Sequence, residues 1–253
     1  MKIAYAIRTC SSVYNYWNSS RMIDADKPTI LLTCVNSLLK SIAGSGHDYV
    51  LSFHDDTSDP QVIDTLKKLC DNHGLAYQFY FNDRGGNFIS QYEWCTKQDA
   101  DYIYCVEDDY LHKPQAIKDM VAVIDYLKTL QPIEYAVHPF NCPHRYSSFE
   151  SLYPGYIIAG PNQYWRSCFH STHTFFVSVQ TFRVYDSIMR DQAYNWFNTA
   201  SVEDKTINQI WRDQQTMLFT PLSSLAFHIA DRSHQDPYEP WYNLWQENLC
   251  NIH

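Results

Sequence analysis

The stretch Asp101-Tyr-Ile-Tyr-Cys-Val-Glu-Asp-Asp-Tyr-Leu-His112 determines how the rest of the chain is interpreted. Its residues 102–106 are aromatic, β-branched or small and carry no charge, which predicts a buried central strand. Three carboxylates, Glu107, Asp108 and Asp109, follow at the carboxyl end of that strand. Ligands bind at this end of open α/β sheets, and a hard cation neutralises adjacent like charges. The stretch therefore indicates a site for Mg²⁺ or Mn²⁺ carrying a diphosphate.

The same acids have a purely structural interpretation. Pro114 follows shortly after them and is typical of the first turn of a helix. A negative charge such as that of Asp109 is favourable near a helix N-terminus. An acidic turn before a helix is thus an alternative to a metal site, and the residues alone leave both open.

Length, charge and cysteine spacing narrow the class of protein to which the chain can belong. The chain has 253 residues, 45% of them hydrophobic and 16% aromatic, which is enough for one large domain with its own core. Its net charge of -9 argues against non-specific nucleic-acid binding, which needs a basic surface. The eight cysteines form no CxxC pair, so neither a disulfide framework nor a structural zinc site is expected.

Apolar runs along the chain are short. None reaches the roughly 20 residues that a membrane span requires. The apolar run over residues 3–7 is also too short for the core of a signal peptide. We therefore expect a soluble, cytoplasmic protein without a membrane span.

Strands and helices alternate through the first half of the chain. Strands are predicted over residues 2–9, 49–53, 77–81 and 101–106, and helices over residues 29–43, 60–73 and 88–97. This alternation predicts a Rossmann-like α/β fold in which helices flank a mostly parallel central sheet.

The second half is less regular. It predicts helices over residues 114–130, 181–190 and 201–212, strands over residues 134–140, 172–179, 217–221 and 224–229, and a long functional loop over residues 141–166. Near the end of the chain, Trp241 and Trp245 stand one helical turn apart, which indicates a short packed helix.

Four motifs, in order, resemble those of the nucleotide-sugar transferases of the GT-A fold, specifically the family-2-like inverting glycosyltransferases. His54-Asp-Asp-Thr-Ser-Asp59 resembles the Asp-Asp-x-Ser signature, and Asn82-Asp-Arg-Gly-Gly86 resembles the glycine-containing loop. The acids that start at Glu107 stand at the Asp-x-Asp position. Glu203-Asp204, followed by a strand and by His228, resembles the Glu-Asp helix and the late histidine.

This sequence departs from the family pattern at two positions. Glu107 stands where the first acid of Asp-x-Asp is expected, and its side chain is one methylene longer. Gln91 stands about where the family usually has asparagine. The first departure affects the geometry of the metal site, and the second leaves the role of its helix in donor binding open.

The resemblance covers roughly residues 1–230 and implies one GT-A domain over residues 1–233. Residues 1–112 would form its nucleotide-binding half, residues 113–233 its smaller acceptor-binding half, and residues 234–253 an aromatic C-terminal tail. The implied reaction moves a sugar from a nucleotide-diphosphate donor, a UDP-sugar, to a hydroxyl of a glycan or glycoconjugate with inversion. Oligomeric state is left open.

The resemblance also implies roles for individual residues. The expected donor-binding residues are Arg8, Thr9, Asp55, Asp56, Arg84, Glu107 and Asp108. Asp109 and His228 are expected to hold Mn²⁺ or Mg²⁺, and Asp204 to act as the base that takes the proton of the acceptor hydroxyl. Asp204 also suits a helix start, where acids favour the dipole, so both roles are compatible.

Three other functions are alternatives to glycosyl transfer. A nucleotidyltransferase that makes the activated sugar would normally have a glycine-rich loop after the first strand, and residues 6–12 contain no glycine. A sugar-nucleotide-binding module without turnover is a further alternative. A zinc hydrolase is disfavoured, because no HExxH or comparable ligand spacing occurs.

Overall fold

The computed structural model describes residues 1–12, 23–83, 85–143, 146, 155–195, 202–213, 215–229 and 239–250. Within these residues, nine strands form one sheet in the order β3-β2-β1-β4-β9-β6-β10-β8-β7. The strands are β1 (Lys2–Thr9), β2 (Asp48–Asp56), β3 (Gln78–Asn82), β4 (Tyr102–Glu107), β6 (Glu134–Val137), β7 (Ile157–Ala159), β8 (Tyr164–Cys168), β9 (Phe175–Ser178) and β10 (Thr216–Pro221). A separate antiparallel ribbon joins β5 (Tyr110–His112) to β11 (Ala226–His228).

The large sheet is mostly parallel. Strands β3, β2, β1 and β4 run in one direction, and β6 and β10 are parallel to each other. Strand β9 lies antiparallel between β4 and β6, and β8 lies antiparallel between β10 and β7. The predicted α/β class with a mostly parallel sheet is therefore confirmed.

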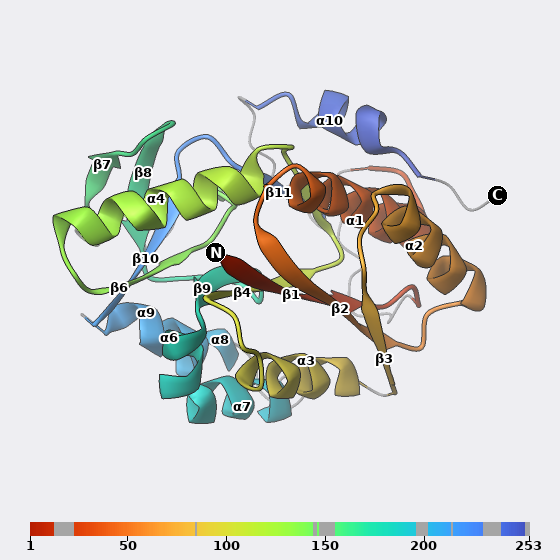
Figure 1. Ribbon diagram of the computed structural model, residues 1–253, viewed down its shortest axis with the longest axis horizontal. Coiled ribbons are helices and arrows are strands. Elements are labelled where there is room, and N and C mark those ends of the chain that lie inside the picture. Colours follow the sequence, from red (N-terminus) through yellow and green to blue (C-terminus); the bar gives the residue numbers. More distant parts are fainter. Residues whose placement is uncertain are drawn as a thin grey trace.

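Helices cover both faces of the sheet (Figure 1). They are α1 (Lys27–Ala43), α2 (Pro60–Asn72), α3 (Gly86–Thr96), α4 (Ala116–Leu130), α6 (Val179–Val184), α7 (Asp186–Asn195), α8 (Val202–Lys205), α9 (Ile207–Arg212) and α10 (Trp241–Asn248). Helices α1, α2 and α4 pack on one face, and α3, α6, α7 and α9 on the other. No helix in the described part of the chain is long and apolar enough to cross a membrane.

Side chains of the central strands alternate between the two faces of the sheet and so contribute to the hydrophobic core on each face. In β1, Ile3, Tyr5 and Ile7 belong to the core beneath α1, whereas Ala4 and Ala6 belong to the core beneath α3. Successive side chains of a strand point to opposite faces, so a strand buried on both faces is apolar throughout. The same alternation decides where the polar residues at the strand ends point.

Several predicted boundaries in the second half were wrong. The helix predicted to start at Pro114 starts at Ala116, because a turn comes first, in which the N–H of Ala116 donates to the carbonyl of Lys113 at 3.0 Å. Within the loop predicted over residues 141–166, β7 and the start of β8 form an antiparallel hairpin. The single helix predicted over residues 201–212 is broken at Thr206 into α8 and α9. Ser201, the first residue of that predicted helix, lies outside the described residues.

The ribbon that carries β5 is attached to α1 by one buried hydroxyl. Ser37 Oγ donates to the carbonyl of Cys34 at 2.6 Å and accepts from the backbone N–H of His112 at 2.8 Å. Strand β5 begins directly after Asp109, so this contact helps to hold the acid cluster against α1.

Replacing Ser37 with alanine is expected to destabilise the protein by about 1–3 kcal/mol, because the buried N–H of His112 loses its partner. Urea unfolding measures this change. Thr65→Ala is the matched control, since that hydroxyl donates to the carbonyl of Gln61 on an exposed helix face and should change stability by less than about 0.5 kcal/mol. Equal effects of the two substitutions would contradict the attachment.

The aromatic tail forms the predicted helix. In α10, Trp241 and Trp245 are 8% and 2% exposed and pack with Leu111 and Phe227 of the β5–β11 ribbon. Lys40 and Asn36 of α1 donate to carbonyls at the end of α10. The tail is thus part of the packed structure next to the β5–β11 ribbon, which follows Asp109 and carries His228.

Candidate functional site

The three acids at the end of β4 each face a different basic side chain. Glu107 is the register partner of Arg8 on β1, so both side chains point to the α3 face of the sheet. Arg8 Nη2 donates to Glu107 Oε1 at 2.7 Å. Side-chain alternation along the strands therefore places this ion pair.

Asp108 points to the opposite face and meets α1. Its Oδ1 accepts from Lys27 Nζ at 2.5 Å, and its Oδ2 accepts from the backbone N–H of Cys10 at 2.8 Å. Burial lowers the pKa of Lys27, but Asp108 and Asp109 raise it by more. The ammonium therefore stays charged and neutralises one acid of the cluster.

Asp109 meets His228 of β11. Asp109 Oδ2 lies 3.3 Å from His228 Nε2, and the His228 ring stacks on Tyr110 with centroids 4.7 Å apart. Burial opposes charge on both groups, yet Asp109 raises the pKa of His228, and His228 lowers that of Asp109. The ribbon thus brings together the two residues that the resemblance assigned to the metal.

The partners of the three acids decide which of them can bind a divalent ion. Within the described ranges, no group of three or more His, Cys, Asp or Glu side chains is arranged to hold a metal. Glu107 and Asp108 are engaged by cations, whereas Asp109 Oδ1 is buried without a hydrogen-bond partner among the described residues. Mg²⁺ is commonly held by one or two protein groups together with substrate phosphates. Asp109 and His228 fit such a site, to which a diphosphate would add the remaining ligands.

A second layer of acids lies at the end of β2. Asp55 Oδ1 accepts from the Thr9 hydroxyl at 2.8 Å, and its Oδ2 accepts from the backbone N–H of Ser58 at 3.0 Å. Asp56 Oδ2 accepts from the backbone N–H of Gly85 at 2.6 Å. Both acids are buried, so they hold the loops that flank the site.

Most of the predicted donor-binding residues lie close together in the structure. Arg8 and Thr9 end β1 beside Asp55, Glu107 and Asp108. Arg84 lies outside the described residues. Its neighbour Gly85 has a φ of 83°, a left-handed conformation that favours glycine at the start of α3.

The Glu203-Asp204 pair lies on α8, on the α3 side of the sheet. Asp204 is half exposed, lies 3.3 Å from Arg212 Nη2 and accepts from Asn208 Nδ2 at 3.1 Å. Glu203 is more enclosed and lies 3.5 Å from His173 Nε2. The role of Asp204 as the base stays a prediction.

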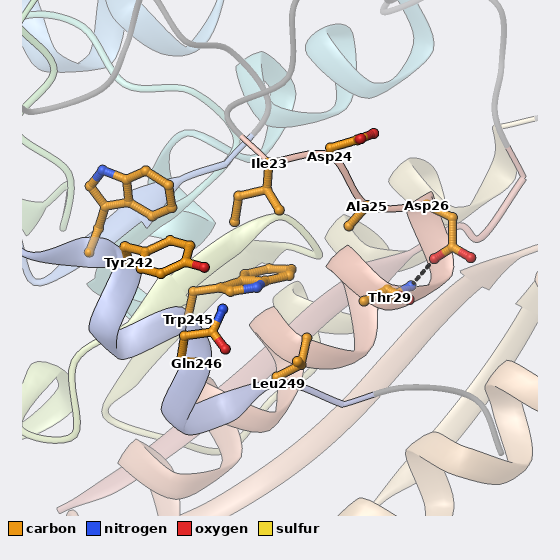
Figure 2. Close-up of a pocket in the computed structure, with 10 residues that line it drawn as sticks. Ile23, Asp24, Ala25, Asp26, Thr29, Tyr242, Trp245, Gln246 and Leu249 are labelled. Carbon is orange, nitrogen blue, oxygen red and sulfur yellow. Dashed lines mark hydrogen bonds between the residues drawn. The ribbon is translucent and has the colours of Figure 1, made fainter.

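A pocket of about 620 Å³ lies between the start of α1 and α10 (Figure 2). Its lining combines aromatic and polar side chains, among them Asp24, Asp26, Tyr242, Trp245 and Gln246. It lies on the α1 face, next to Lys27, whereas Glu203 lies on the α3 face. The pocket and the Glu203-Asp204 pair thus lie on opposite faces of the sheet.

Lys27 was not among the residues singled out from the sequence. It stands between Asp26, whose carboxylate caps α1 through the N–H of Thr29, and Pro28, so the start of the helix is recognisable. That pattern does not reveal the partner, because Asp108 lies 81 positions further along the chain. A lone lysine before a proline carries no signal for a buried ion pair.

No protein-family model matches the chain, and no curated protein matches it in sequence. Among solved structures, residues 1–349 of TarS from S. aureus in complex with UDP-GlcNAc match with a TM-score of 0.52 at 12% identity, over 96% of this chain and 64% of that one. The full TarS structure matches with a TM-score of 0.51, but this chain covers only 36% of it.

Two other similar structures match over almost their whole length. The UTP-bound UGPase from Acinetobacter baumannii has a TM-score of 0.52 at 7% identity, with 97% of this chain and 93% of that chain covered. The inositol-1-phosphate CTP transferase from T. maritima has a TM-score of 0.50 at 13% identity, with 96% and 95% covered. The chain therefore shares the α/β fold of these structures.

Proposed function

We propose that the protein is a metal-dependent glycosyltransferase that moves a sugar from a nucleotide-diphosphate donor, a UDP-sugar, to a hydroxyl of a glycan or glycoconjugate with inversion. The observation that carries this proposal is the acid cluster at the carboxyl end of β4. Two of its members are neutralised by Arg8 and Lys27, and the third pairs with His228 and has one buried oxygen without a hydrogen-bond partner among the described residues. Such a cluster suits Mn²⁺ or Mg²⁺ together with a diphosphate.

The chain's own residues prepare this edge for an anionic leaving group. Arg8 and Lys27 offset the charge of Glu107 and Asp108, which reduces the repulsion that a diphosphate meets there. Asp109 and His228 would hold the ion, which when bound neutralises charge on the leaving diphosphate as a Lewis acid. Thr9, Asp55 and Asp56 keep the neighbouring strand ends and loops in position for the nucleoside.

The similar structures support a nucleotide-sugar donor. TarS is described in complex with UDP-GlcNAc, and its likeness to this chain extends over 96% of the chain. This chain spans about a third of the full TarS structure and less than two thirds of its 1–349 fragment. The acceptor of the present protein is therefore proposed only as a hydroxyl-bearing glycan or glycoconjugate.

A nucleotidyltransferase is the second candidate. The UTP-bound UGPase and the CTP transferase match with TM-scores similar to that of TarS, and this chain covers almost their whole length. Against it stands the loop after β1, which has cysteine and serine at positions 10–12 and no glycine to let a triphosphate approach the backbone. The two functions differ in their products, so one assay separates them.

The test offers the protein two sets of substrates with Mn²⁺ or Mg²⁺. One set contains nucleotide sugars with glycan acceptors, and the other contains nucleoside triphosphates with sugar 1-phosphates. We expect release of nucleoside diphosphate from a UDP-sugar, dependent on the metal. Release of pyrophosphate from the second set alone would show a nucleotidyltransferase, and binding without either product would show a module without turnover.

A further inference from the structure

The pocket between the start of α1 and α10 adjoins the acid cluster through two connections. Lys27, which neutralises one acid of the cluster, directly follows Asp26 of the pocket lining. On the other side, the backbone N–H of Ile229 donates to the carbonyl of Asp109 at 2.9 Å. Ile229 belongs to the same hydrophobic cluster as Trp245 of the lining. The pocket therefore lies beside the proposed metal and diphosphate site.

Aromatic side chains of α10 form one wall of this pocket (Figure 2). Trp245 is 2% exposed and belongs to the hydrophobic cluster against which Ile23 and Ala25 pack, so its ring is held in place. Tyr242 is 57% exposed, and its ring meets that of Trp241 edge to face, with centroids 5.8 Å apart. Such rings offer an apolar face to the C–H groups of a sugar, and the tyrosine hydroxyl adds a polar group.

Two carboxylates make the pocket negatively charged. Asp24 and Asp26 precede α1 and are exposed, and none of the described residues that line the pocket is basic. Carboxylates and the amide oxygen of Gln246 accept the hydrogen bonds that sugar hydroxyls donate. The same two charges repel a phosphate, a sulfate or an acidic sugar. The charge of the pocket therefore disfavours the nucleotide donor and favours a sugar without an acidic group.

We propose that this pocket binds a sugar unit of the glycan acceptor, one that carries no phosphate, sulfate or carboxylate. This inference rests on the proposed glycosyltransferase function and names the class of its acceptor. The volume of about 620 Å³ lies within the range of roughly 300–1,000 Å³ that is typical of ligand sites. Because the pocket adjoins the acid cluster, a unit held there directs the next unit of the glycan toward the donor.

Binding of oligosaccharides to the full chain tests the pocket without any donor. Saturation-transfer NMR is measured with neutral oligosaccharides of glucose, galactose, mannose or N-acetylglucosamine, and with sulfated and uronate-containing ones. We expect binding from the neutral set alone. Tyr242→Ala is expected to weaken it roughly tenfold, because the exposed aromatic wall is lost. Tyr194→Ala is the matched control, since Tyr194 is 56% exposed on α7 and should leave binding unchanged.

A charge reversal tests the exclusion of acidic sugars. Asp24→Lys places a cation in the lining and is expected to allow binding of the uronate-containing oligosaccharides that the wild type rejects. Asp64→Lys, at an exposed acid of α2, is the control and should leave the selectivity unchanged. All variants are first checked for an unchanged unfolding midpoint. Rejection of acidic sugars by the Asp24 variant as strong as that by the wild type would contradict the role of charge.

Transfer assays separate failure of this inference from failure of the proposed function. With a nucleotide sugar that the wild type uses, Tyr242→Ala is expected to raise the acceptor KM roughly tenfold and to leave kcat and the donor dissociation constant unchanged. Neutral sugars that do not bind, or that bind Tyr242→Ala as tightly as the wild type, would overturn the inference. Binding that depends on Tyr242 in a protein that releases no nucleoside diphosphate from any nucleotide sugar would overturn the proposed function and leave a sugar-binding site.

Discussion

Replacing Asp109 with asparagine is expected to abolish the metal-dependent binding of nucleoside diphosphate while the fold stays intact. Asp109 is the one acid of the cluster that is not neutralised by Arg8 or Lys27, and its Oδ1 has no hydrogen-bond partner among the described residues. Asparagine keeps the shape and a contact to His228 but has no negative charge for a divalent ion. A ligand present at about 100 times its dissociation constant stabilises the folded state by about 2.7 kcal/mol, so the loss is measurable as a thermal shift.

Thermal unfolding with UDP, with and without Mn²⁺, measures this effect. Asp64→Asn is the matched control, because Asp64 is an exposed acid on α2 that pairs with Lys67. That variant should respond to Mn²⁺ and UDP as the wild type does. An undiminished metal-dependent shift in the Asp109 variant would refute the assignment of the metal to Asp109.

Replacing Lys27 with methionine is expected to destabilise the protein by about 3–5 kcal/mol, the cost typical of removing one partner of a buried ion pair. The side chains of Lys27 and Asp108 are 18% and 10% exposed, so water replaces little of the lost interaction. Asp108 would remain charged beside Asp109 without its closest cation. Chemical denaturation in the absence of ligands measures the change.

Two controls identify the cause of that loss. Lys67→Met removes an exposed lysine from a surface pair and should change stability by less than about 1 kcal/mol. The double variant Lys27→Met with Asp108→Asn should be more stable than Lys27→Met alone, because no uncompensated charge is left. A double variant as unstable as the sum of the two single changes would show that the ion pair contributes nothing.

Much of the fold could be predicted from local patterns. The strand before Glu107, the helix that ends near Gly44 and the tryptophan pair of α10 were all recognisable, since each signal comes from residues close in sequence. The errors fall in the second half, at the break at Thr206 and in the β7–β8 hairpin. The hairpin is set by the pairing of β8 with β10, and α9 by packing against the sheet, and short-range periodicity reports neither.

The sequence by itself determined that three acids follow the buried core of a central strand. Only the tertiary structure decided which groups meet them. Arg8 reaches Glu107 through the pairing of β1 with β4, Lys27 reaches Asp108 from the start of α1, and His228 reaches Asp109 through the β5–β11 ribbon. These partners are 81–119 positions from their acids, by residue number. A strand's alternation fixes direction locally, whereas the charge that meets each acid depends on how distant segments pack.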